Sequence, residues 1–131
     1  MITIFTTPKD FENEFKLIQE NAINSWRALS NDIEIIIMGN SNGAKEMSDQ
    51  VQGIYIQNVP SSDHKIPTIP GLFETAERIA NNELLCYVNA DIILPKNFLH
   101  TIEFISKVRK KFLAVGHRWD LNIKEKINFY D

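Results

Sequence analysis

Short apolar runs alternate along the chain with segments of helical spacing. The runs lie at 2–5, 33–38, 53–56 and 84–88, and their apolar residues fall largely on consecutive positions. Such runs are typical of strands that are covered on both faces. A further run at 112–116 predicts a fifth strand. Because parallel strands need helix-length connections, the alternation predicts an α/β fold, a three-layer α/β/α sandwich with a mainly parallel sheet.

The segment after the first run has an apolar residue at every third or fourth position, as in a helix that packs on a sheet. Thr7 as N-cap, Pro8 as first helical residue and Asp10 at the third position predict where this helix begins. Between 57 and 70 there is no periodicity, and loops of this length inside a domain are usually functional. Further helices are predicted at 44–48, 72–80 and 98–108.

Composition narrows the class of protein. The 131 residues suit a single domain spanning 1–131, and 44% hydrophobic with 24% charged residues is typical of soluble globular proteins. No apolar run is long enough to span a membrane, and the start lacks a basic leader, so we expect a cytoplasmic protein. The net charge of −3 predicts no nucleic-acid partner. The single cysteine, Cys86, lies in an apolar run and is expected in the core.

The most informative loop follows the run at 84–88. Open α/β sheets bind ligands beyond the carboxyl ends of their strands. Asn89 and Asp91 stand at such an end, where Asp91 could hold a divalent cation against a diphosphate, since Mg²⁺ often takes only one or two carboxylates. Asn89 offers a neutral carbonyl or a hydrogen bond to a ribose. The alternative is that both residues cap the turn and the helix that follow.

Four segments carry a resemblance to a known family. In chain order they read MITIFTTPK, NAINSW, YVNADIIL and VGHRWD, at 1–9, 21–26, 87–94 and 115–120. They resemble a small group of glycosyltransferase-like proteins with the GT-A, or nucleotide-diphospho-sugar transferase, fold. The resemblance covers nearly the whole chain and is more specific for fold than for activity.

The resemblance implies a nucleotide site. In GT-A enzymes the loop after the first strand touches the nucleotide, which implies this role for Thr6, Thr7 and Lys9. An acidic residue that closes the second strand commonly contacts the base or ribose, and here that position is Asn40. An amide thus stands where the family has a carboxylate, and Asn40 is counted among the expected nucleotide-binding residues.

The resemblance also implies a metal. An Asp-X-Asp motif after the fourth strand binds Mn²⁺ or Mg²⁺ and the donor diphosphate in this family. This chain keeps only the last acid of the motif, Asp91, with Asn89 in place of the first. With amides in place of two acids, at Asn40 and Asn89, a lower metal affinity is expected.

Two further residues are candidates for the site. Thr68 precedes a predicted helix whose first amides could face an anion, although a simple helix cap is the alternative. Asp120 could act as the base that deprotonates an acceptor hydroxyl. A structural ion pair between Arg118 and Asp120 is the alternative for that carboxylate.

The functional hypothesis is a glycosyltransferase-like protein that transfers a sugar from a nucleoside diphosphate sugar to an unknown acceptor, with a metal at Asp91. Only about forty residues follow the metal motif, which is short for an acceptor-binding part. The alternatives are a domain truncated at the acceptor side and a non-catalytic nucleotide-binding or interaction module that keeps the GT-A fold.

Overall fold

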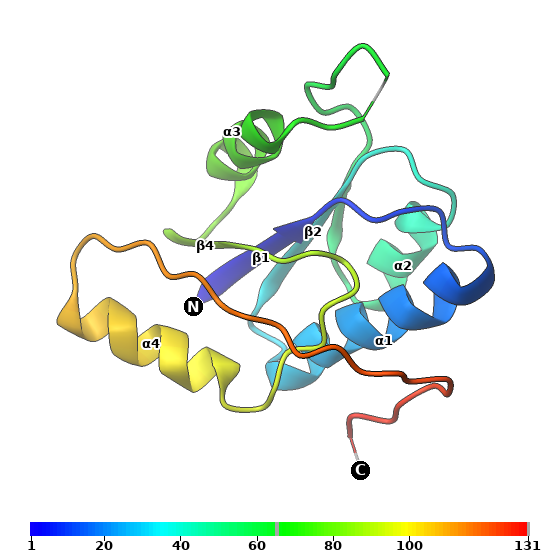
Figure 1. Cartoon of the computed structure of the whole chain (residues 1–131). Helices are drawn as coiled ribbons and strands as arrows, with labels where there is room; N and C mark the ends of the chain where they lie inside the picture. The colour runs from blue at the N-terminus through cyan, green and yellow to red at the C-terminus, as the bar shows by residue number, and fades with distance from the viewer. Residues whose placement is uncertain (65, 131) are drawn as a thin grey trace.

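The computed structural model describes residues 1–64 and 66–130, whose strands and helices alternate (Figure 1). The elements in chain order are β1 (Ile2–Thr6), α1 (Asn13–Leu29), β2 (Glu34–Met38), α2 (Ala44–Gln50), β3 (Ile54–Ile56), α3 (Ile69–Ile79), β4 (Leu84–Tyr87) and α4 (Phe98–Val108). The alternation predicted from the apolar runs is therefore present.

The four strands form one sheet in the order β3-β2-β1-β4, and every pairing is parallel. Ile4 in the middle of β1 stands opposite Ile35 of β2 on one side and Cys86 of β4 on the other. The chain moves outward from β1 to β3 and then returns to the far side of β1. The strand order thus reverses between β1 and β4, and the expected α/β fold with a parallel sheet is confirmed.

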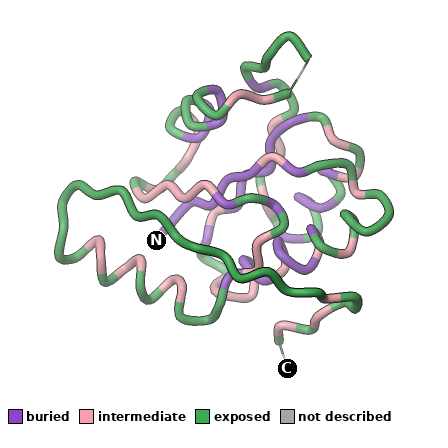
Figure 2. The backbone as a smooth tube through the Cα atoms, in the orientation of Figure 1, coloured by how far each residue is buried: buried purple, intermediate pink, exposed green. Residues whose placement is uncertain are grey.

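Helices cover both faces of the sheet and create two cores. On one face, α1, α2 and α4 pack against a large cluster that is built around Ile4, Trp26 and Ile35. On the other face, α3 places Leu72 and Ala76 on a smaller cluster. Figure 2 shows the buried residues concentrated in the sheet and in the helix faces toward it, whereas the chain after α4 is exposed.

The predicted beginning of the first helix is wrong. Helix α1 begins at Asn13 after Glu12, and not after Thr7. The segment between them bonds to the loop after β2 instead: the Asp10 carboxylate accepts from the Asn42 N–H at 2.8 Å, and the Phe11 N–H donates to the Asn42 carbonyl at 2.9 Å. This tertiary pairing replaces the hydrogen bonds of a first helical turn.

The predicted fifth strand at 112–116 is also wrong. This segment is extended and exposed, and no strand partner for it occurs in the part of the chain that the structure describes. An apolar run becomes a strand only when its backbone groups find a neighbouring strand. Helix α3 begins earlier than predicted, at Ile69, because the Thr68 hydroxyl caps it by accepting from the Gly71 N–H at 3.1 Å.

As to membranes, none of the helices within 1–64 and 66–130 has both the length and the apolar character needed to cross a bilayer.

Arg27 fastens the end of α1 to two neighbouring turns. Its guanidinium is buried and donates to the carbonyl oxygens of Val51 at 2.8 Å and of Ile33 at 2.7 Å. It also donates to the carbonyls of Ser30 and Asn31, both at 3.1 Å. One side chain therefore satisfies three carbonyl groups of the turn from α1 to β2 and a fourth at the end of α2.

We expect Arg27→Ala to lower the free energy of unfolding by about 2–4 kcal/mol, because buried carbonyls lose a charged donor. Urea unfolding followed by circular dichroism measures this change. Arg78→Ala, in the last turn of α3, is the control, because Arg78 is exposed and its loss should cost less than about 0.5 kcal/mol. Equal losses in the two variants would contradict this account of Arg27.

Cys86 of β4 gives a second prediction. Burial raises the pKa of its thiol to about 11. Since only the thiolate is alkylated, iodoacetamide at pH 8 should modify the native protein about a hundredfold more slowly than the protein in urea. Mass spectrometry over time measures both rates. Similar rates in the two states would show that β4 does not shield the thiol.

Candidate functional site

The carboxyl ends of β1 and β4 border a hollow of about 250 Å³ where the strand order reverses. Open parallel sheets bind ligands at this place. The hollow brings together the loop after β1, the first turns of α1 and the loop after β4. We call it the charged hollow, and its lining residues are Lys9, Phe15, Gln19, Asn89, Ala90 and Asp91.

Gln19 of α1 fixes the loop that carries Lys9. Its side-chain oxygen accepts from the Lys9 N–H at 2.7 Å, and its side-chain nitrogen donates to the Lys9 carbonyl at 3.0 Å. The Lys9 ammonium lies 4.7 Å from the centroid of the Phe15 ring, a cation–π distance. The backbone of Lys9 is thus held while its charged end stays at the surface of the hollow.

Helix α1 also holds the opposite wall, the loop after β4. The Trp26 indole N–H donates to the Ile92 carbonyl at 2.9 Å, and the Ser25 hydroxyl accepts from the Leu94 N–H at 3.0 Å. Trp26 and Ser25 are both buried. Because these bonds anchor the residues directly after Asp91, one helix determines how far Asp91 stands from Lys9.

The Asp91 carboxylate faces this hollow from an exposed position. It forms no hydrogen bond and no ion pair with any residue that the structure describes. Burial raises the pKa of Tyr87, and the negative charge of Asp91 raises it further, which places this charge near the end of β4. The capping alternative for Asp91 therefore has no hydrogen bond in its support, and the carboxylate can accept a cation.

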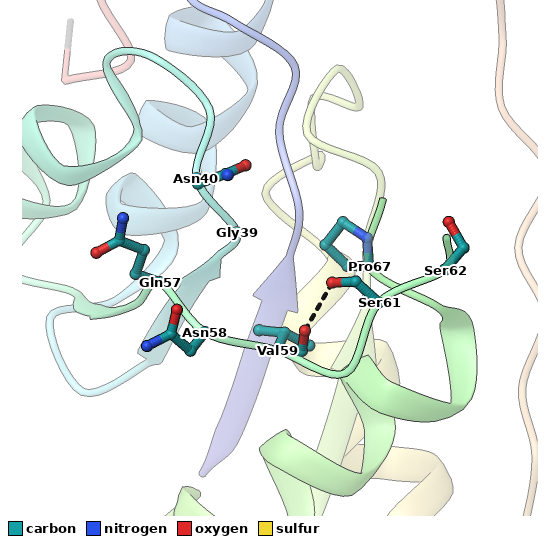
Figure 3. A pocket seen from close by; sticks show the side chains of 8 residues that line it. All are labelled: Gly39, Asn40, Gln57, Asn58, Val59, Ser61, Ser62 and Pro67. Carbon is teal, nitrogen blue, oxygen red and sulfur yellow. Dashed lines mark hydrogen bonds between the residues drawn. The ribbon is translucent and has the colours of Figure 1, made fainter. Parts of the chain in front are cut away.

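A second hollow, of about 240 Å³, lies at the carboxyl ends of β2 and β3 (Figure 3). Amides and hydroxyls predominate in it, so we call it the amide hollow. Gly39 makes its floor: φ is +106°, and a Cβ there would stand 3.0 Å from the Thr7 hydroxyl oxygen, so a larger residue is disfavoured. The lining residues are Gly39, Asn40, Gln57, Asn58, Val59, Ser61, Ser62 and Pro67.

The other predicted nucleotide residues are spread over this edge of the sheet. Thr6 ends β1, is buried, and its hydroxyl has no partner in the described part of the chain. Thr7 is half-buried beside Gly39, and Asn40 lines the amide hollow. Thr68 serves as the cap of α3, and its hydroxyl also donates to the Pro60 carbonyl at 3.3 Å. The alternative considered for Thr68, a helix cap, thus explains one hydrogen bond of its hydroxyl, and the contact with the loop at Pro60 explains the other.

Asp120 lies apart from both hollows. It is exposed in the segment after α4, and its carboxylate stands 3.5 Å from the Arg118 Nε. It lines neither the charged hollow nor the amide hollow. The ion pair considered for Arg118 is formed, and the role of Asp120 as a base stays a prediction.

Several residues of the hollows were missed from the sequence, among them Gln19, Gln57 and Asn58. Gln19 sits beside the apolar stripe of α1, where a buried glutamine is a weak sign of a backbone partner. Gln57 and Asn58 belong to the long loop after β3, which was singled out only as a whole. Their position next to Asn40 follows from the pairing of β2 with β3 and could not be read from the local sequence.

A cation at this site would need ligands from its substrate. Among residues 1–64 and 66–130, no group of three or more His, Cys, Asp or Glu side chains could enclose a metal ion. The charged hollow offers one unpaired carboxylate, Asp91, and the amide oxygen of Asn89 beside it. This set fits an ion that completes its shell with phosphate oxygens and water.

Comparison of the chain with protein-family models, with curated proteins and with solved structures yields no match. The class that the fold itself defines is an α/β protein with a four-stranded parallel sheet.

We expect Asp91→Ala to leave the free energy of unfolding within about 0.5 kcal/mol of the wild-type value, because the carboxylate is exposed and unbonded. Thr68→Ala is the matched comparison: it removes the cap of α3 and should cost about 1 kcal/mol. Thermal unfolding of the two variants measures both effects. A loss at Asp91 as large as that at Thr68 would restore the capping interpretation.

Proposed function

We propose that this chain binds a nucleoside diphosphate sugar along the carboxyl edge of its sheet, with a divalent cation between Asp91 and the diphosphate. The observation that carries the proposal is the pairing of an unbonded carboxylate, Asp91, with an exposed ammonium, Lys9, in one hollow at the point of strand reversal. Such a hollow offers both a cation ligand and a cation of its own to a phosphate group.

The second support is the chemistry of the two hollows. The amide hollow presents Asn40, Gln57 and Asn58, whose amides both donate and accept hydrogen bonds, as the edge of a nucleobase and the hydroxyls of a ribose require. Thr7, in the loop after β1, adjoins Gly39 in this hollow, and Lys9 of the same loop lines the charged hollow. A ligand that reaches both would place its nucleoside among the amides and its diphosphate near Lys9.

When bound, Mg²⁺ or Mn²⁺ would neutralise the charge that develops on the departing diphosphate. Asp91 would hold that ion from the protein side, and Asn89 would direct its amide toward the same hollow. Lys9 would contact the diphosphate from the opposite wall. In the transfer, the bond from the anomeric carbon to the diphosphate oxygen would break and a bond from that carbon to the acceptor oxygen would form. The acceptor hydroxyl would give its proton to a base, the role predicted for Asp120, and the diphosphate would leave with the electron pair of the broken bond.

A second candidate function, binding without turnover, has an observation of its own. Asp120, the residue assigned to deprotonate the acceptor, is paired with Arg118 and lines neither hollow. A protein that keeps the donor site and lacks a base beside it would act as a nucleotide-binding module.

Isothermal titration with UDP, GDP and their sugars, with and without Mn²⁺, tests the binding. We expect Mn²⁺ to tighten binding of the diphosphate, and Asp91→Asn to remove that gain, about tenfold or more, because the ion loses its protein carboxylate. Lys9→Gln should weaken binding with and without the ion, because the diphosphate loses a positive charge. The loop itself should stay in place, because the hydrogen bonds to Gln19 use backbone atoms of residue 9.

Lys45→Gln, on the exposed side of α2, is the charge-matched control and should bind like the wild type. If no nucleotide binds in either condition, the proposal fails. If binding is normal but no sugar hydrolysis or transfer is seen with the bound donor, the second candidate function holds.

A further inference from the structure

Charge is divided unevenly along this chain. Residues 107–126 contain seven Lys or Arg and two Asp or Glu, a net charge of +5, although the whole chain carries −3. The remainder therefore carries −8. We call residues 107–126 the basic loop. Its cations are clustered where α4 ends, at Lys107, Arg109, Lys110 and Lys111, and all four are exposed.

The same stretch exposes large apolar side chains. Leu113 and Trp119 are each 90% exposed, and Val115 is 80% exposed. Along the chain they follow a second apolar stripe of α4, on which Phe104 and Val108 lie one turn apart and exposed. The opposite face of α4, with Phe98, Leu99 and Ile102, packs against the larger core. Exposed apolar groups gathered in this way mark an interaction surface.

Both ends of the basic loop are tied to the fold, and its middle is not. Helix α4 holds one end. At the other end, the Asn21 side chain donates to the Glu125 carbonyl at 3.0 Å and accepts from the Ile127 N–H at 2.9 Å. Between 110 and 124 the described backbone makes none of the hydrogen bonds of a helix or sheet. In Figure 1 this orange segment leaves the end of α4 and crosses toward α1, outside the helices.

We infer that the basic loop and the exposed stripe of α4 bind the surface of an anionic phospholipid membrane. Cations beside Trp, Phe and Leu are the composition of segments that lie in the bilayer interface. Anionic headgroups attract Lys and Arg. Water and phosphate groups at this depth can satisfy the unpaired backbone, which the hydrocarbon interior could not.

The charge of the rest of the protein sets the orientation. A body of −8 is repelled by an anionic surface, so only the face with α4 and the basic loop can approach it. A second copy of the chain is a poorer partner, because mutual docking would bring two such bodies together. This inference does not depend on the nucleotide site, since Lys9 and Asp91 are not part of the surface.

Vesicle sedimentation tests the inference. We expect the protein to bind vesicles of phosphatidylcholine with about 30% phosphatidylglycerol far better than pure phosphatidylcholine, and to be released at about 0.5 M salt. The charge-reversal variant Arg109→Glu, Lys110→Glu, Lys111→Glu should weaken binding by about a hundredfold or more, because each cation near such a surface contributes about 1 kcal/mol.

The matched control reverses three exposed cations elsewhere, Lys16→Glu, Lys45→Glu and Arg78→Glu, which changes the net charge by the same amount. It should bind the anionic vesicles within a few-fold of the wild type. If both triple variants lose vesicle binding equally, binding depends only on the net charge of the protein, and the inference is overturned.

Tryptophan emission provides an independent readout. Of the two tryptophans, Trp26 is buried and Trp119 is exposed, so a blue shift on adding anionic vesicles reports Trp119 entering the interface. Trp119→Ser should remove the shift and leave the circular dichroism spectrum unchanged. Absence of binding to the anionic vesicles overturns the inference. The inference is also overturned if the wild type binds no vesicles but forms a dimer in light scattering, and if the charge-reversal variant of the basic loop abolishes that dimer.

Discussion

The central position of β1 determines the rest of this structure. β1 pairs in parallel with β2 on one side and β4 on the other, and every residue from Ile2 to Thr6 is buried. With the first strand in the middle, the chain must leave to one side and return to the other. The loops after β1 and β4 therefore lie next to each other at the carboxyl edge of the sheet, where the strand order reverses, and together they border the charged hollow. The strand order therefore determines where the hollow lies, and the side chains determine its chemistry.

Helix α1 fixes the positions of the two loops that border the charged hollow. Three of its buried polar side chains bond outward: Gln19 to the loop after β1, and Ser25 and Trp26 to the loop after β4. Buried polar groups must find partners, so these bonds determine the positions of both loops relative to the same rigid element. A change in α1 would therefore alter both walls of the charged hollow together, although the helix contributes few groups that could touch a ligand.

The sequence predicts the strands well and their surroundings less well. Runs such as Ile33 to Met38 are buried on both faces and leave little choice of structure. The beginning of α1 was missed because Asp10 bonds across the molecule to Asn42, a contact that local capping rules cannot include. The segment at 112–116 has strand composition, yet a strand requires a neighbour, and composition cannot supply one. Asp91 could be proposed from its place after a strand, whereas Gln57 and Asn58 join the site only through the pairing of β3.

The charges in the charged hollow determine what effect an amide at position 89, in place of a carboxylate, would have on ligand binding. Two carboxylates would repel a diphosphate until a metal ion had bound between them. In the present hollow, Asp91 and Lys9 balance each other, and Asn89 adds no charge. Under the proposed function, an anionic ligand would approach before any metal ion, and the ion would then strengthen a contact begun by Lys9. An amide at position 89 would then lower the dependence of binding on the metal more than binding itself, because the neighbouring ammonium would carry part of the electrostatic attraction.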